Sequence, residues 1–216
     1  MEGLAQFQFF LEESPNGFMT LADGLGTRSE ELLAEVAGHA DAPTTAVAAS
    51  IFMRRFGLFI AGQLYLLANG KVWDGPAEEI RLIKSAHGIS FAGSPRFLRN
   101  RQEGDLSMVL KEQALPAVEA IRKSGNVSKL ILWENIWGYV IWMYSMEHTA
   151  AASEDSGKLL DDSFWQPEMK RSFFRQFLGG RTLAESQADY RRVTCCLYKE
   201  LPGTDKCPYC PLNNRN

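Results

Sequence analysis

The chain has 216 residues, of which 45% are hydrophobic and 23% charged, and its net charge is −3. This composition is typical of one globular domain, and the negative charge excludes a general nucleic-acid-binding protein, which is normally basic. The longest apolar stretches, residues 46–67 and 130–146, are interrupted by Arg54 and Arg55 and by Glu134. We therefore expect two buried helices and no membrane span. A buried arginine in such a helix needs an anionic partner, from a glutamate or from a substrate.

Helical periodicity and helix-end signals recur along the chain. The segments that carry them cover residues 28–40, 43–68, 103–124, 128–149, 167–178 and 183–192. Ser29 is expected to cap the first segment. Pro116 is expected to interrupt the third, because an internal proline removes a backbone hydrogen bond and clashes with the preceding turn.

The pattern changes between the second and third helical segments. Residues 80–84 and 88–92 alternate apolar and polar side chains around a turn, which predicts a β-hairpin. Residues 151–157 are small and polar and are expected to form a linker. The expected fold class is α+β and helix-dominated, with a helical body and a small β-hairpin element.

The cysteines are confined to the end of the chain, where Cys195, Cys196, Cys207 and Cys210 form a CC-x10-C-x2-C pattern. Two disulfides are disfavoured, because the N-terminal residues lack the basic region of an export signal. A structural zinc fits the second pair, but adjacent cysteines diverge and suit one tetrahedral ion poorly. A [2Fe–2S] cluster is larger and spreads its four ligands over two irons, so it accommodates the pattern best. The spacing leaves open which cysteines share an iron.

The residues around the cysteines form a wider motif. Residues 191–212 read RRVTCCLYKELPGTDKCPYCPL, with arginine shortly before the adjacent cysteines and Cys-Pro-Leu at the end. This stretch resembles the C-terminal motif of the FhuF-like ferric siderophore reductases. Trp133-Glu134-Asn135 resembles a Trp-x-Asn segment of the same family. The resemblance implies a [2Fe–2S] cluster held by the four cysteines.

The resemblance also implies a reaction, the one-electron reduction of a ferric siderophore of hydroxamate type. Hard oxygen donors hold Fe(III) strongly and Fe(II) weakly, so reduction would release the iron. The sequence has no phosphate-binding glycine loop and no dinucleotide fingerprint. The electrons are therefore expected from an external donor, a ferredoxin-like protein or a flavin reductase. Two alternatives stay open: a siderophore-binding or redox-sensing iron–sulfur module without turnover, and a structural zinc protein.

The C-terminal segment differs from the rest of the chain in charge. Residues 166–216 carry nine Lys or Arg and five Asp or Glu, a net +4, which leaves −7 for residues 1–165. Cations near an anionic cluster favour its reduced form and attract an acidic donor protein. We expect a helical substrate-docking body over 1–165 and a C-terminal [2Fe–2S]-binding subdomain over 166–216. Free thiols and the lack of an export signal predict a cytoplasmic location.

Basic and aromatic side chains are the candidate substrate contacts. Arg96, Arg99 and Arg101 are close in sequence and can bind carboxylate or hydroxamate oxygens. Trp133 and Trp137 lie in an aromatic helical segment and can face a bulky ligand, although a position in the hydrophobic core explains them as well.

Overall fold

The computed structural model describes residues 2–86 and 88–213. Helices form 57% of the chain and strands 10%, so the α+β, helix-dominated class is confirmed. The α-helices are α1 (Leu21–Leu25), α2 (Ser29–Ala40), α3 (Thr45–Ala68), α4 (Asp105–Ser107), α5 (Leu115–Gly125), α6 (Lys129–Met146), α7 (Ala150–Leu160), α8 (Asp162–Trp165), α9 (Phe173–Phe177) and α10 (Leu183–Ala188). The strands are β1 (Phe9–Leu11), β2 (Met19–Thr20), β3 (Lys71–Trp73), β4 (Arg81–Ser85), β5 (Gly88–Gly93) and β6 (Leu98–Asn100). Short 3-10 helices form η1 (Glu2–Phe7), η2 (Ala77–Glu79), η3 (Pro95–Phe97) and η5 (Tyr198–Glu200), and η4 (Met108–Ala114) is π-helical.

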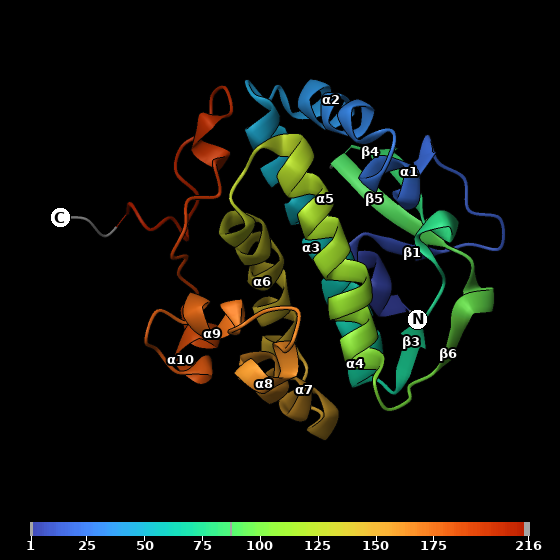
Figure 1. Ribbon diagram of the computed structural model, residues 1–216, viewed down its shortest axis with the longest axis vertical. Helices are drawn as coiled ribbons and strands as arrows, with labels where there is room; N and C mark the ends of the chain where they lie inside the picture. The colour runs from blue at the N-terminus through green and yellow to red at the C-terminus, as the bar shows by residue number, and fades with distance from the viewer. Residues whose placement is uncertain (1, 87, 214–216) are drawn as a thin grey trace.

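Helix α3 is the centre of the molecule, with α2, α5, α6, α7 and the sheets packed around it (Figure 1). Thr44 caps its start by accepting a hydrogen bond from the Val47 N–H at 3.2 Å. Gly57 permits a close crossing of α3 and α6, because a Cβ there would lie 2.8 Å from the backbone oxygen of Asn135. In the part of the chain that the structure describes, α3 alone is long and apolar enough to cross a membrane, and most of it is buried inside the protein.

The strands form a mixed four-stranded sheet, in the order β1-β5-β4-β2, and a separate antiparallel pair of β3 and β6. The predicted hairpin is confirmed as β4 and β5, with Leu82 opposite Phe91. The sheet is larger than this hairpin because β1 joins β5 in parallel and β2 joins β4 in antiparallel fashion. Those two edge strands have three and two residues, too few to show an alternating pattern in the sequence.

The interruption expected near Pro116 takes the form of a π-helical segment. The chain stays helical from α4 through η4 into α5, and Pro116 occupies the first turn of α5. Proline lacks a backbone N–H, and the wider π-helical turns before it absorb the missing hydrogen bond without ending the helix.

The linker expected at residues 151–157 is wrong, because these residues belong to α7. Thr149 caps this helix by accepting a hydrogen bond from the Ala152 N–H at 3.0 Å. The buried Asp155 makes an ion pair with Arg101 at 2.6 Å, so a small, polar segment still has one face packed inside the protein.

Other helix boundaries also differ from expectation. The segment expected to be helical over 167–178 contains only α9, which starts after Ser172 because its hydroxyl accepts a hydrogen bond from the Arg175 N–H at 3.1 Å. The last helix ends at Ala188 and not at residue 192. Ser29 is not a cap, since it is the first residue of α2.

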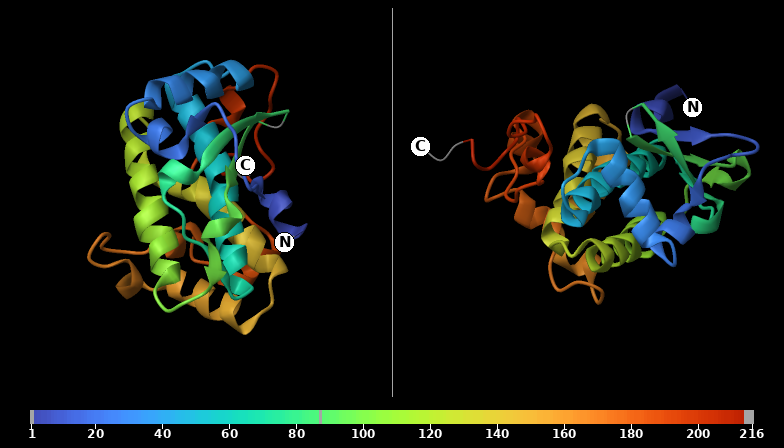
Figure 2. Two further views of the ribbon diagram at one scale, coloured as in Figure 1. Left: turned by 90° about the vertical axis from the view of Figure 1, so that its right-hand side faces the viewer. Right: turned by 90° about the horizontal axis from the view of Figure 1, so that it is seen from above.

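The C-terminal segment lies on the side of the helices opposite the sheets (Figure 2). Its first part shares the main core, where the ring of Phe174 lies 5.7 Å from that of Trp133 and 5.4 Å from that of Trp165. Three of the cysteines form a second, separate buried cluster. The division into two domains at residue 166 stays a prediction. The buried cluster that is separate from the main core contains only the cysteines and the side chains next to them.

Candidate metal centre

The cysteines lie in two short turns that face each other. Cys196, Cys207 and Cys210 are buried together under Tyr198, and Cys195 is half-buried. The Cys210 N–H donates to the Cys207 carbonyl at 3.0 Å, which closes the second turn and keeps both side chains on one side. All four thiols are free, as a metal centre requires.

The sulfurs of Cys196 and Cys207 are 3.6 Å apart. Two thiolates on one tetrahedral metal, each about 2.3 Å from it, are about 3.8 Å apart. The pair therefore fits as two ligands of a single metal atom. In the described residues no three His, Cys, Asp or Glu side chains already surround one point, and the Cys195 sulfur instead accepts a 3.4 Å hydrogen bond from the Leu197 N–H. A tetrathiolate site would therefore need Cys195 and Cys210 to join this pair, with Cys195 giving up its bond to the Leu197 N–H.

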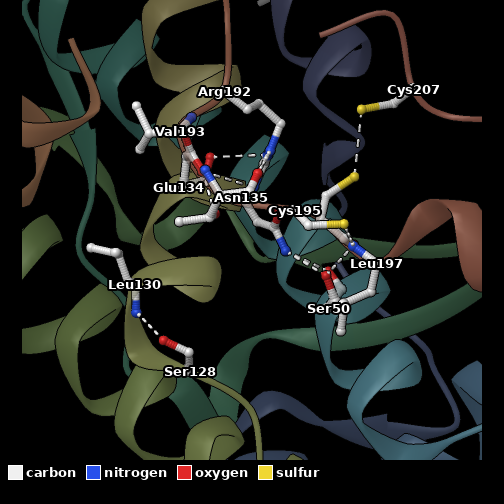
Figure 3. A network of polar contacts seen from close by, with 12 residues as sticks. Ser50, Ser128, Leu130, Glu134, Asn135, Arg192, Val193, Cys195, Leu197 and Cys207 are labelled. Carbon is white, nitrogen blue, oxygen red and sulfur yellow. Dashed lines mark hydrogen bonds and ion pairs between the residues drawn. The ribbon is translucent and has the colours of Figure 1, made fainter. Parts of the chain in front are cut away.

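A buried carboxylate on α6 holds the chain just before the cysteines (Figure 3). Glu134 is fully buried and accepts hydrogen bonds from the N–H groups of Val193 at 2.6 Å and Thr194 at 2.8 Å, and from the Thr194 hydroxyl. The Arg192 Nη2 atom lies 3.4 Å from the same carboxylate. We call residues 192–196 the anchored loop. Its backbone donors replace the water that a buried carboxylate has lost, so the anchor fixes where the cysteine pair begins.

A second anchor joins the cysteine pair to the crossing of α3 and α6 (Figure 3). The Ser50 hydroxyl on α3 donates to the Cys196 carbonyl at 2.7 Å. The side-chain amide of Asn135 donates to the same hydroxyl and to the Ser50 carbonyl, both at 2.9 Å. Leu197 then has a φ of 59°, in the left-handed region that bulky residues rarely occupy, and this turns the chain away after the pair.

Two arginines lie against the thiols. Arg192 is buried, and its Nη2 atom makes no hydrogen bond within the described residues. Arg54 has no carboxylate within ion-pair distance in the same part of the chain, and its guanidinium lies 5.0 Å from the centre of the Tyr198 ring. Burial by itself lowers the pKa of Arg54, but Tyr139 and the thiols of Cys196 and Cys207 raise it above its ordinary value. Arg192 is paired with Glu134, whereas Arg54 has no carboxylate partner among the described residues, and an uncompensated cation beside the cysteines fits a group with net negative charge, as a tetrathiolate cluster has.

A cavity of about 470 Å³ opens onto the sulfurs, and we call it the thiol cavity. Its lining includes Arg54, Tyr139, Arg192, Cys196 and Cys207. Burial and then the neighbouring Cys196 raise the pKa of Cys207 to about 11. A metal therefore has to displace a proton from this thiol when it binds.

The three arginines expected to bind substrate have protein partners instead. Arg96 makes an ion pair with Glu79 at 2.8 Å. Arg99 pairs with Asp74 and, at 2.7 Å, with Asp105, and Arg101 makes the ion pair with α7 described above. None of the three lines the thiol cavity. Their role as substrate contacts stays a prediction, and the structure does not bring them to the cysteines.

The two candidate tryptophans lie in the core. Trp133 is fully buried, and Trp137 is 1% exposed with its ring stacked on Phe174 at 4.8 Å. Neither lines the thiol cavity, so a substrate contact by either stays a prediction too. The cavity is instead bordered by Trp142, which is 38% exposed and one helical turn further along α6.

Some residues of the site carry a signal in the sequence and others do not. Glu134 is a carboxylate in an otherwise apolar helix, which by itself indicates a buried partner. Ser50 is one of several serines in helical segments, and nothing in its neighbours along the chain indicates a contact with Cys196. Comparisons of this chain with protein-family models, with curated proteins and with solved structures found no match.

Proposed function

We propose that the protein is a ferric-chelate reductase in which Cys195, Cys196, Cys207 and Cys210 hold a [2Fe–2S] cluster. The observation that carries the proposal is the 3.6 Å separation of the Cys196 and Cys207 sulfurs beside Arg54 and a cavity. When bound, the cluster would supply one electron at a time. The ferric ion of the substrate gains that electron and becomes ferrous, and an external ferredoxin-like or flavin-reductase donor replaces it.

The surrounding residues support this assignment through charge. A tetrathiolate [2Fe–2S] centre is formally 2− when oxidised and 3− when reduced. Arg54 and Arg192 favour the more negative state, which makes the centre easier to reduce, and the thiol cavity gives a chelate access to the sulfurs. The proposed reaction needs no general acid or base, and the described side chains at the cavity are positioned for binding and charge compensation.

The first test is the metal content of protein purified without oxygen. We expect a red-brown solution with two irons and two sulfides per chain, as the cluster formula requires, that changes spectrum with dithionite. The reduced protein should reoxidise quickly with a ferric chelate and yield Fe(II), trapped by a ferrous-specific dye. Slow reoxidation without substrate preference would indicate a sensor, and a colourless protein with stoichiometric zinc would indicate a structural metal site.

The second test is Cys207→Ser, which should lose the visible spectrum and iron release while the helices stay folded by circular dichroism. Asp205→Asn is the control, since Asp205 lies two residues before Cys207, is exposed and does not line the thiol cavity. The ligand assignment is wrong if Cys207→Ser keeps full absorption and activity.

A further inference from the structure

A second cavity, of about 450 Å³, lies beside the thiol cavity. It is formed where α2, the β4–β5 hairpin and η5 meet α3, and we call it the basic cavity. Arg54 and Tyr139 line both cavities, so a molecule in the basic cavity would contact side chains that also border the thiols. Tyr198 lines it as well and packs against the buried cysteines.

The basic cavity contains two adjacent arginines and, among the described residues that line it, no Asp or Glu. Arg55 is half-buried and lies against the hairpin, where a Cβ on Gly88 would come 3.0 Å from its Nε atom. Neither Arg54 nor Arg55 has a carboxylate within 4.0 Å in residues 2–86 and 88–213. Burial lowers the pKa of Arg55, Tyr139 offsets part of this effect, and the charge of Arg54 adds to the lowering.

Most of the other buried or half-buried arginines in the described part of the chain behave differently, although Arg81 on β4 also lacks a carboxylate partner. Arg99, Arg101 and Arg192 each have a carboxylate partner. An anionic cluster can offset the charge of Arg54, which lines the thiol cavity. Arg55 lines only the basic cavity and keeps an uncompensated charge. A partly buried guanidinium in that position is matched by a carboxylate, whose two oxygens accept its paired N–H groups.

We propose that the basic cavity binds the carboxylates of a ferric chelate, so the preferred substrates are anionic carboxylate chelates and not neutral hydroxamate chelates. This inference rests on the proposed function and changes the substrate class expected from the sequence. Arg55 binds the carboxylate, Arg54 lies between the chelate and the sulfurs, and the two tyrosine rings form the wall. The ferric ion is thereby placed next to the thiol cavity.

Gallium(III) complexes test the inference without any electron transfer, because gallium(III) keeps the charge and size of Fe(III) and is not reduced. By calorimetry, we expect gallium citrate to bind at least about tenfold more tightly than a neutral gallium trihydroxamate. Arg55→Gln should weaken citrate binding at least about tenfold. Arg55→Lys keeps the charge but loses the paired N–H donors of the guanidinium, and it should have a smaller effect. Arg122→Gln removes the same charge from an exposed site on α5 and should bind like the wild type.

Equal binding of the neutral complex, or undiminished binding by Arg55→Gln, would overturn the inference. So would Arg55-dependent binding of riboflavin phosphate but not of gallium citrate, since the cavity would then serve a flavin donor. Circular dichroism of both Arg55 variants separates lost binding from lost folding. The failure of this inference can be told apart from the failure of the proposed function: a protein that releases iron from hydroxamate chelates without binding gallium citrate keeps the proposed function and loses only this inference.

Discussion

The Glu134 anchor gives a prediction whose size follows from the structure. Glu134→Gln keeps the shape of the side chain and removes its charge. The amide oxygen of glutamine can still accept a hydrogen bond from the N–H of Val193 or of Thr194. The amide NH2 group, however, lies against the other of these two N–H groups, and two donors cannot form a hydrogen bond with each other. Arg192, whose side chain is only 6% exposed, loses its carboxylate.

The expected cost is about 3–5 kcal/mol, the usual loss when one partner of a buried ion pair is removed. Hydrogen bonds to a charged group contribute about 1.5–3 kcal/mol each, so the loss of one bond and of the pairing with Arg192 gives the same range. This cost acts on the docking of the anchored loop, because the helical body has its own core. We therefore expect the loop to open locally before the protein unfolds.

Hydrogen exchange at the amides of Val193 and Thr194 measures this opening directly. A loss of about 3 kcal/mol corresponds to roughly hundredfold faster exchange at these two amides. The central helices should keep their protection, and the metal content should fall in parallel with the loop. The double variant Glu134→Gln with Arg192→Met should be less affected than the sum of its single changes, because it leaves no unpaired charge.

Glu119→Gln is the control for the loss of a carboxylate. Glu119 pairs with Lys129 and Arg122 on the surface and is 34% exposed, so its removal should cost no more than about 1 kcal/mol. If the two loop amides of Glu134→Gln exchange within a few-fold of the wild-type rate, the carboxylate does not hold the loop and the reasoning fails.

Two further predictions concern the body. Gly57→Ala should lower the free energy of unfolding by about 1–3 kcal/mol in urea titrations, because the added methyl group would meet the backbone of α6 at Asn135. Gly157→Ala is the control: it has open space around it and should be neutral or slightly stabilising. The Arg99 guanidinium lowers the pKa of Asp105 in the folded protein. The ion pair therefore contributes fully to stability above about pH 4, the pKa of an unfolded aspartate, and this contribution is lost as the pH falls through the lower pKa of the folded state. Asp105→Asn should therefore cost about 1–3 kcal/mol at pH 7 and make stability less sensitive to acid, and an unchanged acid titration of stability would contradict this.

The sequence predicted most of the long helices because their signals are local. The end of α3 follows from Asn69-Gly70, and its continuous apolar surface indicates burial, whereas its start lies at Thr45, after the capping Thr44, and not at residue 43 as expected. The hairpin of β4 and β5 was also readable from alternation. The linker expected at residues 151–157 was wrong because the signal for α7 is not local. This helix packs through an ion pair of Asp155 with Arg101, which is far away in the sequence.

The candidate site divides in the same way. The cysteine spacing is a local pattern, so the sequence alone is enough to propose the four cysteines as ligands. The contact of Ser50 with Cys196 depends on how α3 crosses α6, and the residues next to Ser50 in the sequence do not indicate that crossing. The candidate substrate arginines lie away from the thiol cavity, and Arg96 and Arg99 make ion pairs with Glu79 and Asp105, so their role as substrate contacts stays a prediction.

The bridge from Asn135 through Ser50 to the Cys196 carbonyl has a consequence for the speed of redox chemistry. Electron transfer is slowed when atoms must shift position as the charge changes. Here the backbone of a proposed ligand is tied by hydrogen bonds to the junction of two close-packed helices, where there is little room to shift. A redox centre held there would have a low reorganisation energy. Ser50→Ala would then slow turnover even where the midpoint potential stays the same.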